Sequence, residues 1–238
     1  WGITMTYVGF LLGAMGADYY PRLTEVIHDK VAAVRLMNDQ AQLGLAIGGP
    51  VLLLLIGLAP WVITLLYSSA FEPAVSLLQW QMVGNVFKLA SWALAFSIIA
   101  AARGKTFFLM ELSFNIVFLG MVLIFLPHVG LEVTAYAFVL GYLVYLTIVY
   151  VLARNIHGFR WQALSLGLLG LHTSLGVALL VLALMAPLAA AIASPLLAAV
   201  TGLFGLRVVL SKVGKQGHLP TRLYGIFARL GWPIRSAN

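Results

Sequence analysis

The stretch Gln79–Trp92, QWQMVGNVFKLASW, lies inside the run Val75–Ala102, which is otherwise strongly apolar. At ~1.5 Å per residue, a helix of that length crosses a hydrocarbon core of ~30 Å. Lys88 falls near the middle of the run, and the next charge towards the C-terminus is Arg103. That separation is roughly 22 Å along a helix, so the Lys88 amine cannot reach water at that end by extending its side chain.

Four side chains around this lysine are predicted to share one helix face. They are spaced i, i+4, i+7 and i+11: Gln81, Asn85, Lys88 and Trp92. A charge at mid-bilayer costs at least ~2.5–3.5 kcal/mol on insertion scales, so it must face a water-filled cavity or a partner. Lys88 is therefore the first candidate for a functional residue. The alternative is a lysine that stabilises packing by hydrogen-bonding carbonyl groups or a carboxylate such as Glu111.

The composition places the chain in a membrane. Of its 238 residues, 62% are hydrophobic and only 9% are charged, whereas soluble domains carry ~25% charged residues. The net charge of +7 then indicates orientation and contact with anionic lipid rather than with nucleic acid. The absence of cysteine excludes disulfides, thiolate metal sites and cysteine nucleophiles. The predicted fold class is all-α, a polytopic membrane helix bundle.

About seven transmembrane helices are expected, together with one amphipathic segment, 24–42, that lies on the surface or protrudes and runs into the second span. The expected spans are 4–16, 43–67, 75–102, 107–126, 132–152, 163–185 and 188–209. The pair Gly9 and Gly13 is suited to close helix contact. Pro50 and Pro60 lie inside the second span and mark either a transport hinge or static kinks.

Lysine and arginine are confined to alternate loops. The loops after the first, third, fifth and seventh spans are basic, and the other three carry neither residue. The positive-inside rule then places the basic loops and the C-terminus in the cytoplasm. The tail, 211–238, is predicted to be cytoplasmic and basic, either as a helix on the anionic leaflet or as a solvated segment.

Other polar residues within the spans leave their roles open. Glu111 and Asn115 share a face, and Glu111 either caps the start of its helix or faces a cavity. His172 is expected to hydrogen-bond a neighbouring helix. Trp92 either stacks on sugar rings or lies at the lipid boundary.

No catalytic constellation is present. The sequence has no HExxH, GxSxG or Walker A motif, so we expect neither an enzyme nor a cofactor or metal site. A lysine at mid-depth suits an anionic cargo because it binds phosphate or carboxylate as a point charge. Gln81 and Asn85 offer amide donors and acceptors for hydroxyl groups.

Several segments resemble Wzx-type O-antigen translocases, in the order and spacing of that family. They are Met15–Thr24, Leu66–Phe71, Trp80–Trp92, Ala101–Lys105 and Glu111–Asn115. The resemblance covers roughly residues 5–155. It implies the fold of the multidrug/oligosaccharidyl-lipid/polysaccharide exporter superfamily, in which two six-helix lobes surround a central cavity.

On this resemblance, residues 1–155 are five helices of the C-terminal lobe, and 156–210 are two additional transmembrane helices. The chain begins at Trp1 with no signal peptide, and we expect it to be a fragment that lacks the N-terminal lobe. The family moves undecaprenyl-diphosphate-linked oligosaccharide across the bacterial inner membrane by alternating access, sometimes coupled to an ion gradient. The implied partners are this lipid-linked oligosaccharide, the bilayer and the missing lobe.

The resemblance also implies that Lys88 contacts the diphosphate or an acidic sugar, with Gln81 and Asn85 as polar companions. Related stretches carry Asp where this chain has Asn85, so a Lys–Asp pair is absent and the lysine is free for cargo or relies on Glu111. Three alternatives remain. They are a drug/cation antiporter of the same superfamily, a membrane-embedded glycan polymerase or transferase, and a purely structural membrane partner in which Lys88 serves packing.

Overall fold

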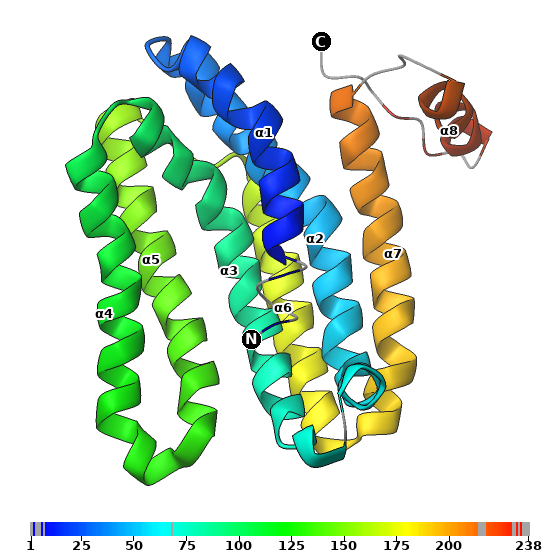
Figure 1. Cartoon of the computed structure of the whole chain (residues 1–238). Coiled ribbons are helices and arrows are strands. Elements are labelled where there is room, and N and C mark those ends of the chain that lie inside the picture. Colours follow the sequence, from blue (N-terminus) through cyan, green and yellow to red (C-terminus); the bar gives the residue numbers. More distant parts are fainter. Residues whose placement is uncertain are drawn as a thin grey trace.

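Helices make up the regular structure of the residues that the computed structural model describes, which are 2, 6, 8–67, 69–213, 218–229, 232 and 234. The elements are α1 (Gly9–Val26), α2 (Lys30–Leu66), η2 (Ser69–Phe71), α3 (Ala74–Ala100), α4 (Gly104–Val129), η3 (Gly130–Glu132), α5 (Val133–His157), α6 (Ala163–Met185), α7 (Pro187–Val213) and α8 (His218–Arg229). The long helices stand side by side as a bundle (Figure 1). The predicted all-α membrane helix bundle is confirmed.

Five described stretches are long and apolar enough to cross a membrane. They are Lys30–Leu66, Ala74–Ala100, Gly104–His157, Ala163–Met185 and Pro187–Lys212. The third contains both α4 and α5, which form an antiparallel pair joined through η3 (Figure 1). Helix α1 is not among the five, and it carries Asp18, Arg22 and Glu25 within its 18 residues. The expected first span, 4–16, lies partly outside the described residues.

The long helices alternate in direction, so the turns gather at two ends of the bundle (Figure 1). The α1–α2, α3–α4 and α5–α6 turns and the end of α7 share one end, which we call the basic end. Apart from Lys88, the described lysines and arginines belong to this end or to α8. The α2–α3, α4–α5 and α6–α7 turns at the opposite end carry none among their described residues.

Helix α2 runs through the middle of the bundle and stays continuous over 37 residues although it contains Pro50 and Pro60. A proline cannot donate to the carbonyl four residues earlier, so Pro60 leaves the Ile56 carbonyl without its helical partner. Gln79 of α3 supplies the missing donor, with Nε2 at 3.0 Å from that oxygen. This hydrogen bond braces α2 at Pro60 and favours a static kink over a hinge there.

The closest helix contacts are between α2 and α7. A Cβ added at Gly57 would collide with Ser194 Oγ and the Ala190 carbonyl oxygen. Small residues at such crossings let two backbones touch without lipid between them. The predicted close contact at Gly9 and Gly13 is wrong for the described residues, because nothing lies within 4 Å of a Cβ added at either glycine.

The expected surface segment, 24–42, is divided between two helices. Helix α1 ends at Val26, and α2 begins at Lys30 after a short turn. The Asp29 carboxylate caps α2 by accepting from two of its first backbone N–H groups, at 3.0 and 3.1 Å. Met37 and Ala41 are fully buried. The segment does run into the second span, and it is amphipathic as expected: one side, with Met37 and Ala41, packs in the core, while Glu25, Lys30 and Arg35 are exposed.

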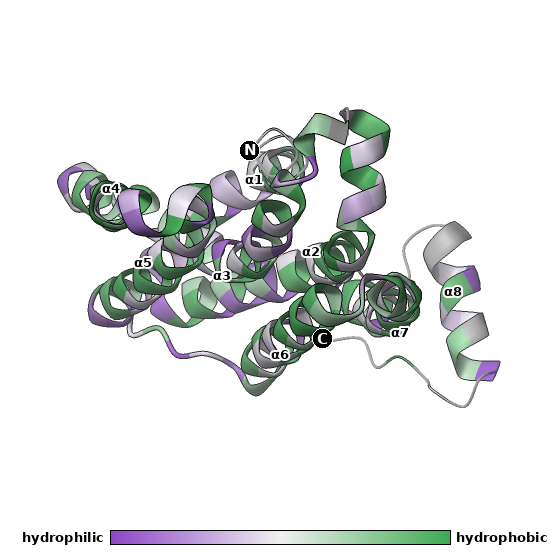
Figure 2. Cartoon of the chain, turned by 90° about the horizontal axis from the view of Figure 1, so that it is seen from below, coloured by the Kyte–Doolittle hydropathy of each residue, from purple (hydrophilic) through white to green (hydrophobic). Residues whose placement is uncertain are grey.

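The tail contains the short helix α8, which lies beside the basic end (Figure 1). Figure 2 shows polar and apolar residues mixed along α8, whereas α2, α6 and α7 are mainly hydrophobic. Tyr224 and Phe227 of α8 are buried against Leu210 of α7, and the Tyr224 hydroxyl donates to the Leu210 carbonyl at 2.7 Å. These two apolar side chains therefore pack on the bundle. Residues 214–217, 230, 231, 233 and 235–238 of the predicted tail lie outside the described residues.

Candidate functional site

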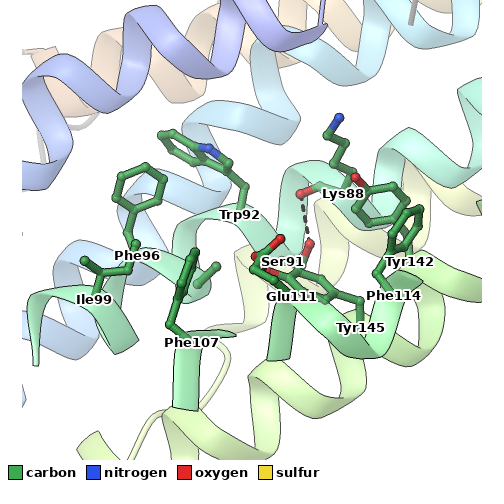
Figure 3. Close-up of a pocket in the computed structure, with 11 residues that line it drawn as sticks. Lys88, Ser91, Trp92, Phe96, Ile99, Phe107, Glu111, Phe114, Tyr142 and Tyr145 are labelled. Carbon is green, nitrogen blue, oxygen red and sulfur yellow. Dashed lines mark hydrogen bonds between the residues drawn. The ribbon is translucent and has the colours of Figure 1, made fainter. Parts of the chain in front are cut away.

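A cavity of about 260 Å³ lies between α3, α4 and α5. Figure 3 shows its lining side chains, which come from all three helices. Its polar and aromatic members include Lys88, Ser91 and Trp92 from α3, Glu111 from α4, and Tyr142 and Tyr145 from α5. The cavity therefore combines a cation, a carboxylate and hydroxyl groups within apolar helices.

Lys88 is half-buried and lines this cavity, as expected of a mid-membrane charge. Its Nζ lies 5.5 Å from the centre of the Tyr142 ring, within the range of a cation–π contact. Neither ion pair found within 4.0 Å among the described residues includes Lys88. The ammonium group is thus held by an aromatic face rather than neutralised by a carboxylate in direct contact.

Glu111 lies two turns inside α4, which begins at Gly104. It lines the same cavity as Lys88 and accepts a hydrogen bond from the Tyr145 hydroxyl. The alternative in which Glu111 caps the start of its helix is therefore wrong. An ionised carboxylate has about four acceptor positions, so the bond from Tyr145 orients Glu111 without exhausting its capacity to accept.

Aromatic rings form much of the remaining wall. Trp92 stands 4.7 Å from Phe96 between ring centres and 5.8 Å from Tyr19 of α1. The Tyr19 hydroxyl donates to the Ala93 carbonyl at 2.7 Å and so ties α1 to α3 beside this wall. Trp92 lines the cavity and is half-buried, which is an environment suited to stacking on a ring-shaped ligand.

The structure separates Gln81 and Asn85 from the cavity. Gln81 lies seven residues before Lys88, roughly 10 Å along the helix, and lines a different cavity of about 150 Å³. Asn85 is fully buried, with its amide nitrogen donating to the Gln81 carbonyl at 2.9 Å. Its Oδ1 atom has no hydrogen-bond partner among the described residues. The shared helix face is real, but the cavity occupies only one part of its length.

Asn115 and His172 lie outside the cavity as well. The exposed Asn115 amide donates to the backbone carbonyl of Glu111 at 3.0 Å. His172 is buried, and its Nδ1 bonds the Leu168 carbonyl of its own helix at 2.9 Å. The expected bond from His172 to a neighbouring helix is wrong: its ring packs against Gly49 of α2, and its Nε2 has no hydrogen-bond partner among the described residues.

Tyr142 and Tyr145 are among the cavity residues that sequence reasoning did not assign. Their spacing of three residues puts them on one face of a tyrosine-rich helix. That pattern was visible in the sequence, but several tyrosines of the same helix lie elsewhere. Only the packing of α5 against α3 and α4 distinguishes these two from the others.

A second polar group that the sequence did not indicate joins α2 to the α5–α6 turn. Asn38 Oδ1 accepts from the Gln162 backbone N–H and from the Ser165 hydroxyl, both at 2.8 Å, and Asn38 Nδ2 donates to the Arg160 carbonyl at 3.0 Å. Gln42 Nε2 donates to Ser165 Oγ at 2.9 Å. Because these bonds use both ends of the buried Asn38 amide, the group reads as a structural clamp rather than a ligand site.

Comparison with protein-family models, with curated proteins and with solved structures finds no match to this chain. The fold and the cavity define the class of protein as a helical membrane bundle that contains a cavity lined by polar and aromatic side chains. The resemblance to O-antigen translocases rests on the sequence segments alone.

Proposed function

We propose that this chain is the C-terminal lobe of a transporter that moves undecaprenyl-diphosphate-linked oligosaccharide across the bacterial inner membrane. One observation carries the proposal. The Lys88 ammonium lines a cavity within apolar helices and has no carboxylate within 4.0 Å among the described residues. Placing a cation at such a position costs ~2.5–3.5 kcal/mol or more, and packing alone does not offset that cost. We therefore infer that the ammonium group binds an anionic cargo.

The chemistry of the cavity fits a phosphorylated, hydroxyl-rich cargo. Lys88 supplies a point charge for a phosphate or an acidic sugar. Trp92 and Phe96 offer faces on which sugar rings stack, and Ser91 and Tyr142 offer hydroxyl groups. In alternating access, the cavity would bind the head group at one membrane face and release it at the other, with the N-terminal lobe supplying the opposite wall.

The test uses a strain that lacks its O-antigen flippase, complemented by the complete gene that encodes this chain. The variants are Lys88→Ala, Lys88→Arg and, as a matched control, Lys105→Ala, which removes an exposed cation outside the cavity. We expect Lys88→Ala to lower surface O-antigen by at least ~tenfold, equivalent to about 1.4 kcal/mol. Lys88→Arg should retain part of the export, and Lys105→Ala nearly all of it, at equal membrane levels.

Normal export with Lys88→Ala would contradict the assignment of Lys88 as a cargo contact and favour its packing role. Failure of the wild-type gene in a panel of strains that covers different repeat units would contradict the proposed function itself.

A drug/cation antiporter is the second candidate, and Glu111 is the observation that favours it. The carboxylate lines the same cavity as the aromatic wall, and a carboxylate beside aromatic faces suits a cationic aromatic cargo. Glu111→Gln separates the two functions. It should abolish resistance to cationic drugs if the chain exports them, and it should leave O-antigen export within about twofold if Lys88 is the principal contact.

A further inference from the structure

A second cavity, distinct from the one around Lys88, opens at the basic end of the bundle. It has a volume of about 260 Å³ and is formed by the α1–α2 turn, the α3–α4 turn and the end of α5. Its polar members are His28, Lys30, Arg103 and His157. We call this group the basic pocket, because four basic side chains line it and, among the residues that the structure describes, no carboxylate does.

The four side chains come from distant parts of the sequence, so the fold assembles the pocket. His157 is only 4% exposed, and its Nε2 lies 3.3 Å from the Ser97 carbonyl oxygen, which fixes the ring. Lys30 and Arg103 are exposed, and both act electrostatically on the His157 ring. The two exposed cations, Lys30 and Arg103, therefore share one pocket with a buried imidazole, and their N–H groups can donate to a phosphate group with oxygens at several sides.

The carboxylate that neighbours two pocket residues in the sequence, that of Asp29, already caps a helix. Asp29 lies between His28 and Lys30 in the chain, but its side chain caps α2 by accepting from the N–H groups of Val31 and Ala32. The charge of Asp29 is thus directed at the helix terminus rather than at the pocket cations. Helix α4, in contrast, starts at the pocket without a side-chain cap at Arg103. Its N-terminal dipole adds further positive potential at the same place.

The turn that presents Arg103 has an unusual backbone. Ala102 has a φ of 56°, in the left-handed region that residues with a Cβ rarely adopt. Strained positions of this kind concentrate at functional sites. The conformation reverses the chain between α3 and α4 and places Arg103 beside the end of α5.

A groove of about 460 Å³ adjoins the pocket and shares Lys30 and His157 with it. The groove adds Arg35 and two apolar side chains, Val31 and Val34, of which Val31 is 81% exposed. The pocket cations suit a phosphorylated head group, and Val31 and Val34 offer an apolar surface beside them, at the end of a membrane bundle, for the first part of an acyl chain.

From these observations we infer that the basic pocket is a phosphate-binding site, whose phosphate belongs to an anionic lipid head group. The site is separate from the Lys88 cavity, so it does not depend on which cargo the chain transports. Bound lipid would add a further link between the α1–α2 turn, the α3–α4 turn and the end of α5, which already pack in one buried apolar cluster.

The test measures binding of dioctanoyl phosphatidylglycerol to the purified full chain in a non-ionic detergent by microscale thermophoresis. The pocket variant is Lys30→Gln/Arg103→Gln. The matched control is Lys105→Gln/Arg154→Gln, which removes the same charge from two exposed residues outside the pocket. We expect the pocket variant to lose roughly tenfold or more in affinity and the control less than about twofold.

Equal losses in both variants would show attraction by net charge alone and overturn the site, as would undiminished binding to the pocket variant. The variant Lys30→Arg/Arg103→Lys keeps both charges and should bind within about threefold of the wild type. Loss in that variant too would overturn the charge argument. Inorganic phosphate titrated alone identifies the source: binding at least as tight as that of the lipid would assign the site to soluble phosphate and overturn the lipid head group, whereas binding at least about tenfold weaker supports the head group.

Discussion

The α2–α7 interface and the space between α3, α4 and α5 are both made by apolar helices, yet one is closed and the other is hollow. Helix α2 buries eighteen of its 37 residues, whereas α4 buries only Met110. At the first interface Gly57 lets the backbones touch. At the second, Trp92, Phe107 and Tyr142 hold the helices apart and leave a cavity. The size of the contacting side chains, rather than their hydrophobicity, decides whether two membrane helices enclose a site.

The largest loss of stability is expected from a substitution that forces the α2–α7 interface apart. Gly57→Val places a branched side chain against Ser194 and the Ala190 carbonyl oxygen, and we expect it to lower the free energy of unfolding by ~3 kcal/mol. The measurement is unfolding by SDS titration in mixed micelles. Gly120→Val on α4 is the control, because nothing lies within 4 Å of an added Cβ there, and it should cost under ~1 kcal/mol. Equal costs at the two glycines would refute the contrast between the interfaces.

A smaller effect is expected where polar rather than steric contacts hold α2. Asn38→Leu removes the partners of the Arg160 carbonyl, the Gln162 N–H and the Ser165 hydroxyl, and it should cost ~2 kcal/mol. Asn115→Leu is the matched control, since the exposed Asn115 bonds only to its own helix and should change stability by less than ~0.5 kcal/mol. The same SDS titration measures both. A cost at Asn38 no greater than at Asn115 would mean that the clamp does not hold the α5–α6 turn.

The smallest change in stability is expected at the α3–α4 turn, which belongs to the second region. Ala102→Gly removes the left-handed strain at a φ of 56° and should raise the free energy of unfolding by ~0.5–1 kcal/mol after the added freedom of the unfolded chain is deducted. Ala101→Gly is the control because Ala101 has a φ of −79° and gains no relief. Thermal unfolding of both variants tests the sign, and stabilisation by Ala101→Gly instead would contradict the prediction.

The sequence predicted Lys88 as a cavity residue because no geometry of a single helix brings it to water. It also predicted the six helices from α2 to α7, though not the bounds of α1, and the confinement of basic residues to alternate turns, which the structure gathers at one end. It failed at Gln81 and Asn85 because periodicity defines a face along the whole helix, whereas a cavity takes only a short part of that face. At 24–42 it predicted an amphipathic segment, but not the break between α1 and α2 or that the apolar side, with Met37 and Ala41 fully buried, packs in the core.

By itself, the sequence determined that the chain is a helical membrane bundle and which of its turns are basic. It also identified Lys88 as the charged residue near the middle of its helix. These follow from hydropathy, helical rise and the cost of a charge in lipid, all of which are local properties. Only the tertiary structure decided that Glu111 faces the same cavity as Lys88, and that His28, Arg103 and His157 meet in one pocket. Those groupings depend on how side chains fill the space between the helices. Because the side chains involved are far apart in the sequence, no local pattern predicts how they pack.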